Sequence, residues 1–169
     1  MTATPSAILL RYVANPIVSA ILRSPLHRLL SRRVMLITVV GRRTGRRYTL
    51  PVSYVSQGRA LDVLVAHREL KVWWRNLEGG APVELLLDGR MIPARAEALT
   101  FERDKRAFIV ALRNYVAGNR RGAQAVGIRD VEDVPGLRFA ADVVAIVKID
   151  LPAARLAMGG TSTSDRART

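Results

Sequence analysis

Four arginines are concentrated in one short turn of the sequence, and this spacing makes the turn a candidate site for an anion. The stretch GRRTGRRYTLP holds them, separated only by one threonine and one glycine; they are Arg42, Arg43, Arg46 and Arg47. Glycines at positions 41 and 45 let the backbone approach a ligand closely, and guanidinium groups donate paired hydrogen bonds to phosphate or carboxylate. Such a turn suits a phosphate, although a solvated basic turn would have the same spacing.

A second candidate segment is LKVWWRNL, at residues 70–77. Helical spacing places Trp73 and Leu77 on one side and Trp74 a step away, so we expect at least one indole in the core. Trp73 is equally consistent with ligand contact and with packing. For Asn76 we expect a structural hydrogen bond in preference to a ligand contact.

Charge is distributed unevenly along the chain. Its 169 residues include 27 basic and 14 acidic residues, a net charge of +13, and the first acid is Asp62. This asymmetry predicts an anionic partner on one side of the molecule, such as a phosphate-bearing ligand, a membrane surface or nucleic acid. Nucleic acid is disfavoured because only 5% of the residues are aromatic and no recognition motif is evident.

Cysteine is absent, and His27 and His67 are the only histidines. Disulfides, thiolate metal sites and a cysteine nucleophile are therefore excluded, and no metal centre is expected. This composition fits a reducing compartment. We expect a cytoplasmic protein, with peripheral contact at the inner face of the membrane as an additional option, and the sequence leaves its oligomeric state open.

Six segments have the residue patterns of strands. Residues 34–40, VMLITVV, are continuously apolar, as in a strand buried on both faces, whereas residues 48–56 alternate. Pro51 cannot donate a ladder hydrogen bond, which predicts a sheet edge or a bulge there. The other four strands are expected at residues 60–66, 82–87, 90–99 and 142–151.

One long helix is predicted between the fifth and sixth strands. Residues 101–118 have apolar positions at helical spacing and end at a glycine. Strands in antiparallel succession with one helix before the last predict an α+β fold, a closed or split barrel, and no dinucleotide-binding glycine motif is present. We expect a helical segment at residues 1–33, a barrel domain at 34–151 and a flexible tail at 152–169.

The N-terminal 33 residues are apolar but interrupted by arginines and prolines. No apolar run is long enough to span a membrane or to act as a signal peptide. Two short helices are predicted at about residues 16–23 and 25–31. Their apolar stripe, flanked by arginines, could pack on the protein's own core or lie as an anchor on an anionic membrane.

Taken together, GRRTGRRYTLP and VWWRNL resemble the deazaflavin-dependent nitroreductase family. Its members pair a G-R-[KR]-[ST]-G turn and a following proline with a downstream W-x-x-N segment, and the resemblance covers roughly residues 34–98. It implies a six-stranded split β-barrel, similar to flavin reductases and pyridoxamine oxidases. It also implies that coenzyme F420 is used to reduce quinones, nitroaromatics or activated alkenes.

The same resemblance implies cofactor contacts from the turn, from the start of the loop at residues 66–71, and from the tryptophan segment. The candidates are Arg42, Arg43, Thr44, Gly45, Arg46, Arg47, Ala66, His67, Arg68, Trp73 and Asn76. In the family pattern, Arg42, Arg43 and Thr44 would contact the anionic tail. Trp73 would lie beside the deazaflavin, where an indole gives apolar stacking area.

A catalytic acid or base is not required if the cofactor delivers hydride, because solvent or a hydroxyl group can supply the proton. The weak candidates for a proton donor are Tyr48, Ser53, Tyr54, His67 and Tyr115. Each of these residue types is more often structural.

Two functions are compatible with this pattern. The leading hypothesis is an F420-dependent oxidoreductase that transfers hydride to a small lipophilic acceptor. The loop AHRELK, residues 66–71, is shorter than is usual in the family and leaves the cofactor's identity open. The alternative is therefore a split-barrel protein that lacks F420 activity and binds a fatty acid, heme or flavin mononucleotide.

Overall fold

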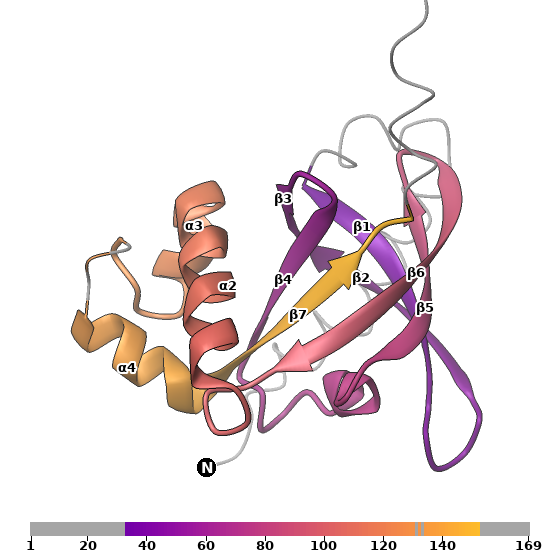
Figure 1. Cartoon of the computed structure of the whole chain (residues 1–169), viewed down its shortest axis with the longest axis horizontal. Helices are drawn as coiled ribbons and strands as arrows, with labels where there is room; N and C mark the ends of the chain where they lie inside the picture. Colours follow the sequence, from indigo (N-terminus) through magenta and orange to yellow (C-terminus); the bar gives the residue numbers. More distant parts are fainter. Residues whose placement is uncertain (1–32, 131, 133, 153–169) are drawn as a thin grey trace, which may run out of the picture.

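The protein is built around one antiparallel sheet. The computed structural model describes residues 33–130, 132 and 134–152 (Figure 1). Seven strands pair in the order β2-β1-β5-β6-β7-β4-β3. The strands are β1 (Val34–Val40), β2 (Arg47–Ser53), β3 (Val55–Gln57), β4 (Ala60–Ala66), β5 (Ala81–Leu87), β6 (Arg90–Leu99) and β7 (Val144–Asp150).

Helices connect the strands at two points of the described chain. A short 3-10 helix, η2 (Trp73–Leu77), lies between β4 and β5. Between β6 and β7 come α2 (Lys105–Gly118), α3 (Arg120–Gln124) and α4 (Val134–Val143). These three helices gather on one side of the sheet in Figure 1.

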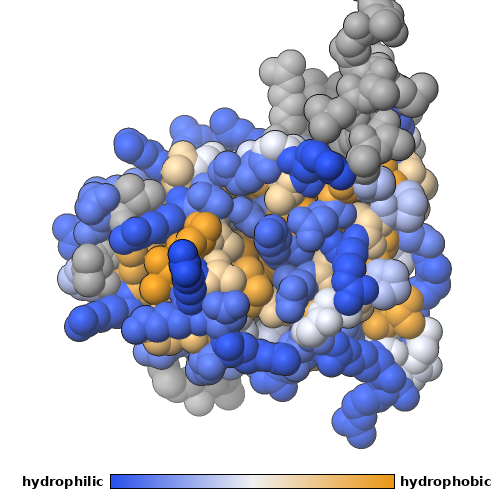
Figure 2. All heavy atoms as spheres, viewed as in Figure 1, coloured by the Kyte–Doolittle hydropathy of each residue, from blue (hydrophilic) through white to orange (hydrophobic). Residues whose placement is uncertain are grey.

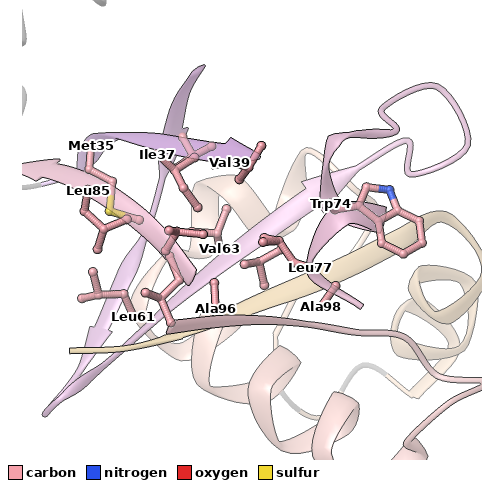
Figure 3. Packing of buried hydrophobic residues seen from close by; sticks show 14 of the residues in the cluster. Met35, Ile37, Val39, Leu61, Val63, Trp74, Leu77, Leu85, Ala96 and Ala98 are labelled. Carbon is pink, nitrogen blue, oxygen red and sulfur yellow. The ribbon is translucent and has the colours of Figure 1, made fainter. Parts of the chain in front are cut away.

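The sheet curls around an inner apolar core. Alternate residues of β1 and β4 point into the curl, together with residues of β5, β6 and η2 (Figure 3). Strand β2, at one edge of the sheet, also contacts β4, which is next to the other edge. The sheet is therefore bent into a half-barrel whose open side lies between β2 and β4.

A second core lies between the sheet and the helices. Along β7, Ala145, Val147 and Ile149 face the inner core, whereas Val144 and Ile146 pack with α2 and α4. Burial on both faces explains why this strand is almost continuously apolar. The face shown in Figure 2 is largely hydrophilic, with hydrophobic residues gathered in patches that include one over the helices.

The prediction of six strands with one long helix needs correction. After β2 the chain bends at Tyr54, away from its pairing with β1, and Val55–Gln57 pair with β4 instead. A turn at Gly58, whose φ is 61°, connects Val55–Gln57 to β4. This pairing makes a seventh strand, β3. Three helices, not one, precede β7 in the described chain, and residues 142 and 143 belong to α4 instead of the last strand.

Other expectations about the fold are confirmed or lie outside the described residues. Among the described strands, β2 pairs with β1 alone, with Pro51 opposite Leu36, so the sheet edge predicted from this proline is present. The predicted helices at residues 16–31 and nearly all of the predicted tail lie outside the described residues. Among the residues that are described, no helix has the length and apolar character needed to cross a membrane.

Candidate functional site

The arginine turn, residues 41–47, is a compact loop at the end of the β1–β2 hairpin. The Gly41 amide donates to the Arg46 carbonyl at 2.8 Å, and the Gly45 amide donates to the Gly41 carbonyl at 2.8 Å. Gly45 has a φ of 66°, which favours glycine. A Cβ at position 41 would lie 2.9 Å from the Tyr48 ring, so the turn closes tightly against this side chain.

Two of the four arginines in the turn are bonded to the protein. The guanidinium of Arg42 donates to the carbonyls of Asn76 and Glu78, and Arg47 pairs with Glu84. Arg42 therefore fastens the turn to the end of η2. These contacts give both arginines a structural task, and their predicted contact with the cofactor stays a prediction.

The remaining two arginines of the turn are exposed. Within the described part of the chain, the guanidinium groups of Arg43 and Arg46 make no hydrogen bond or ion pair. Thr44 is engaged within the turn, because its hydroxyl accepts from the Arg46 amide at 3.3 Å. Arg43 and Arg46 are therefore the side chains that the turn leaves able to bind an anion.

Asn76 connects the turn to the tryptophan segment. Its Oδ1 accepts from the Arg42 amide at 3.0 Å, and its Nδ2 donates to the Trp73 carbonyl at 3.0 Å. Both ends of the side-chain amide are thus used inside the protein. The expectation of a structural hydrogen bond at Asn76 is confirmed.

The two indoles have different environments. Trp74 is 5% exposed, lies at one end of the inner core in Figure 3, and donates from Nε1 to the Arg68 carbonyl at 3.1 Å. Trp73 is half-buried and packs on the edge of the same core. The prediction that at least one indole is in the core is confirmed by Trp74.

A groove of about 420 Å³ occupies the open side of the half-barrel, and Trp73 lines it. One wall is residues 50–53 of β2, and the other is residues 63–66 of β4. Residues of α2 and of the segment after α3 close one side. Four predicted site residues therefore meet in this groove: Ser53, Ala66, Trp73 and Tyr115.

Tyr115 is 3% exposed, and burial raises the pKa of its phenol. Its oxygen accepts a hydrogen bond from Asn119 Nδ2 at 3.0 Å. The orientation of that amide is fixed because its Oδ1 accepts from the Gly122 amide at 3.0 Å. The phenol oxygen thus serves as acceptor toward Asn119, and its own proton remains available for donation.

In the loop of residues 66–71, Arg68 is held away from the groove by contacts on the other side of the loop. Arg68 donates to Glu102 and to the Asp142 carbonyl, and its hydrogen bond to Glu102 raises its pKa. The same contact holds the pKa of Glu102 at about 2, below its usual value. Arg68 therefore clamps the loop to the segments before α2 and β7.

The other candidates lie elsewhere. His67 is exposed, has a φ of 52°, and lies 3.8 Å from the Glu69 carboxylate. Tyr48 is 44% exposed beside the arginine turn, and Tyr54 packs on the inner core. None of these three residues lines the groove.

A family profile covers this site. The profile of the F420H(2)-dependent quinone reductase family matches residues 23–128, which is more than half of the chain. The chain belongs to this family. The cofactor of this family is reduced coenzyme F420, so the predicted relationship and the predicted cofactor are both confirmed.

Solved structures with similar architecture are distant in sequence. An F420-H2 dependent reductase, FDR-A, is 15% identical with a TM-score of 0.47, covering 72% of this chain and 96% of its own. The heme storage protein HutZ from Vibrio cholerae is 16% identical with a TM-score of 0.45, covering 81% and 89%. A heme binding protein from Mycobacterium smegmatis is 15% identical with a TM-score of 0.42, covering 79% and 51%. No curated protein matches the sequence.

For this quinone reductase family member, the sequence reasoning missed part of the groove. Lys71 lines the groove with Trp73, and its place two residues before this tryptophan was the available signal. The wall after α3, including Ala125 and Val126, carried no such signal, because only tertiary packing brings it to the groove. Within the described chain, no cluster of histidine and acidic residues could hold a metal ion.

Proposed function

We propose that the protein reduces a lipophilic quinone with hydride from reduced coenzyme F420. The observation that carries this proposal is the connection between the groove and the arginine turn. Trp73 lines the groove, Asn76 bonds to the Trp73 carbonyl, and the Arg42 amide bonds to Asn76. The open-sided groove and the basic turn therefore belong to one continuous structure.

The residues fit this cofactor in two respects. Most of the residues that line the groove are apolar, Pro51, Val63 and Val65 among them, and the half-buried Trp73 offers an aromatic surface to a flat ring. Arg43 and Arg46 offer guanidinium groups, unbonded within the described chain, to an anionic tail. When bound, the reduced deazaflavin supplies a hydride.

The acceptor would enter the same groove. The apolar residues of the walls favour a flat, lipophilic molecule, and displacement of water by the bound molecule strengthens any hydrogen bond made inside. Tyr115 lines this groove, and its oxygen accepts a hydrogen bond from Asn119, which leaves the phenolic proton for another partner. We assign Tyr115 to the hydrogen bond with an oxygen of the acceptor, where negative charge develops as hydride arrives.

The first experiment measures turnover by the full-length protein. Reduced coenzyme F420 is mixed with a water-soluble naphthoquinone, and the return of the oxidised cofactor's absorbance is followed. We expect quinone-dependent turnover, and parallel assays with a nitroaromatic and an activated alkene rank the acceptors. Absence of cofactor binding at high micromolar concentration would overturn the proposal.

The role of Tyr115 is tested by Tyr115→Phe, which keeps the ring and removes the hydroxyl. We expect kcat to fall on the order of 10-fold, because one hydrogen bond to the reacting oxygen is lost, with cofactor affinity unchanged. The matched control is Tyr48→Phe, which removes a hydroxyl outside the groove. Equal kcat values for the two variants would rule out the assignment of Tyr115.

The alternative of a binding protein without F420 activity is tested in a parallel titration. The purified chain is titrated with coenzyme F420, flavin mononucleotide and heme, and tryptophan fluorescence and visible spectra are recorded. We expect coenzyme F420 to quench the tryptophan fluorescence at a lower concentration than flavin mononucleotide or heme does. Tighter binding of heme or flavin mononucleotide, without quinone reduction, would favour the alternative.

A further inference from the structure

A second group of arginines gathers where α2 ends and α3 begins. Arg120 and Arg121, together with Arg33, line a depression of about 520 Å³ against residues 54–56. We call this depression the arginine pocket. Among the described residues, no acidic side chain lines it, and no residue that lines it also lines the groove beside Trp73.

Tertiary packing fixes the position of the arginine pocket. A Cβ at Gly118 would lie 2.2 Å from Cγ1 of Val55, so the end of α2 packs directly on β3. On the other side, the Arg33 carbonyl accepts from the Tyr54 amide at 3.1 Å. Arginines that are almost ninety positions apart in the sequence are thereby held around one depression.

These arginines are not neutralised by the described protein. The guanidinium groups of Arg33, Arg120 and Arg121 make no hydrogen bond or ion pair with any residue that the structure describes. Arg68 and Arg103, in contrast, are each paired with a glutamate. Three positive charges around one depression repel one another, and a bound anion removes this repulsion.

We propose that the arginine pocket binds a phosphate group. Guanidinium groups donate paired hydrogen bonds to phosphate oxygens, and the hydroxyl of Ser56, which also lines the pocket, adds another donor. Two sources carry this chemistry: a soluble phosphate ester, and the headgroup of an anionic phospholipid. This site goes beyond the proposed reductase function, and its binding does not depend on coenzyme F420.

The test compares two double variants of the full-length protein. Arg120→Gln with Arg121→Gln removes two charges from the arginine pocket. The control, Arg106→Gln with Arg113→Gln, removes two charges from exposed positions of α2 outside it. Arg33→Gln probes the pocket from a different element, and thermal melting and circular dichroism verify that each variant folds.

Two probes separate the sources of the phosphate. Glycerol 3-phosphate is titrated by calorimetry at low ionic strength, and flotation is measured with vesicles of phosphatidylglycerol and phosphatidylcholine against phosphatidylcholine alone. Binding of glycerol 3-phosphate identifies a soluble ligand, whereas binding of anionic vesicles alone identifies a lipid headgroup. Either result supports the proposal if the pocket variants weaken it selectively.

We expect the pocket double variant to weaken binding on the order of 25-fold, about fivefold for each arginine, since each contributes about 1 kcal/mol at an anionic surface. The α2 control should lose about twofold or less, through general electrostatics. Equal losses in the two double variants would overturn the proposal, as would failure of the wild type to bind either probe. Quinone reduction is measured separately, so failure of one proposal is distinguishable from failure of the other.

Discussion

The arginine turn and the arginine pocket have similar charge, but they differ in what holds their arginines. In the turn, four arginines are close in sequence, and the protein itself bonds Arg42 and Arg47. In the pocket, arginines distant in sequence converge, and the described protein bonds none of their guanidinium groups. The density of arginine in a sequence is therefore a poor measure of the charge available to a ligand. Tertiary contacts decide which guanidinium groups remain available.

The largest expected effect is on the affinity for coenzyme F420, which should depend on the arginine turn and not on the arginine pocket. Arg43→Glu should raise the dissociation constant of coenzyme F420 roughly 10- to 100-fold, because a charged hydrogen bond is lost and a repulsive charge is added. Fluorescence quenching measures this affinity. The matched control is Arg90→Glu, an exposed arginine at the start of β6, and we expect it to bind as the wild type does. If the double variant of the arginine pocket lost as much cofactor affinity, the two regions would form a single site.

The connection between the turn and η2 is weakened by Asn76→Ala, which leaves the bonds from the Arg42 guanidinium to backbone carbonyls in place. This change removes the hydrogen bonds to the Arg42 amide and the Trp73 carbonyl, and we expect the free energy of unfolding to fall by about 2 kcal/mol. Urea unfolding measures the loss. The control is Asn114→Ala on α2. This asparagine is half-buried, and its side chain makes no hydrogen bond with the described residues; the bond from Gln57 goes to its backbone carbonyl. Equal losses in the two variants would mean that Asn76 does not hold the turn.

Local patterns predicted much of the fold and part of the site. The continuous apolar run of β1, the sheet edge at Pro51 and a core indole follow from residue type and spacing, and all three are present. The bend at Tyr54 that creates β3 depends on pairing with β4, which no local pattern specifies. The groove wall after α3 and the arginine pocket could not be predicted for the same reason, because each forms between segments that are distant in sequence.

A smaller effect is expected from the ion pair between Arg68 and Glu102, which should make the stability of the protein depend on pH. The hydrogen bond from Arg68 holds the pKa of Glu102 at about 2, below the usual 4.5. A lowered acid pKa stabilises the folded state above the unfolded pKa, and this stability is lost as the pH falls from about 4.5 to about 2. The Glu102 side chain is 55% exposed, so solvent screening limits the contribution to below about 1 kcal/mol.

The measurement for this pair is urea unfolding of the wild type and of Glu102→Gln at near-neutral pH and near pH 3. The wild type should be the more stable protein at neutral pH, and the difference should shrink in acid. Glu97→Gln, an exposed glutamate of β6, serves as the control. A difference that does not change with pH would show that the ion pair with Arg68 contributes no stability.

The smallest expected effect on stability concerns Arg47, which lies in the turn but is already paired. Arg47 and Glu84 are 57% and 44% exposed, so Arg47→Gln should lower the free energy of unfolding by only about 0.5 kcal/mol or less. A double-mutant cycle with Glu84→Gln measures this coupling. Cofactor affinity is the sharper readout, because Arg43→Gln should weaken binding whereas Arg47→Gln should change it by about twofold at most. Equal weakening by the two variants would mean that Arg47 leaves Glu84 to bind the cofactor, and that pairing within the free protein does not determine which arginines are available.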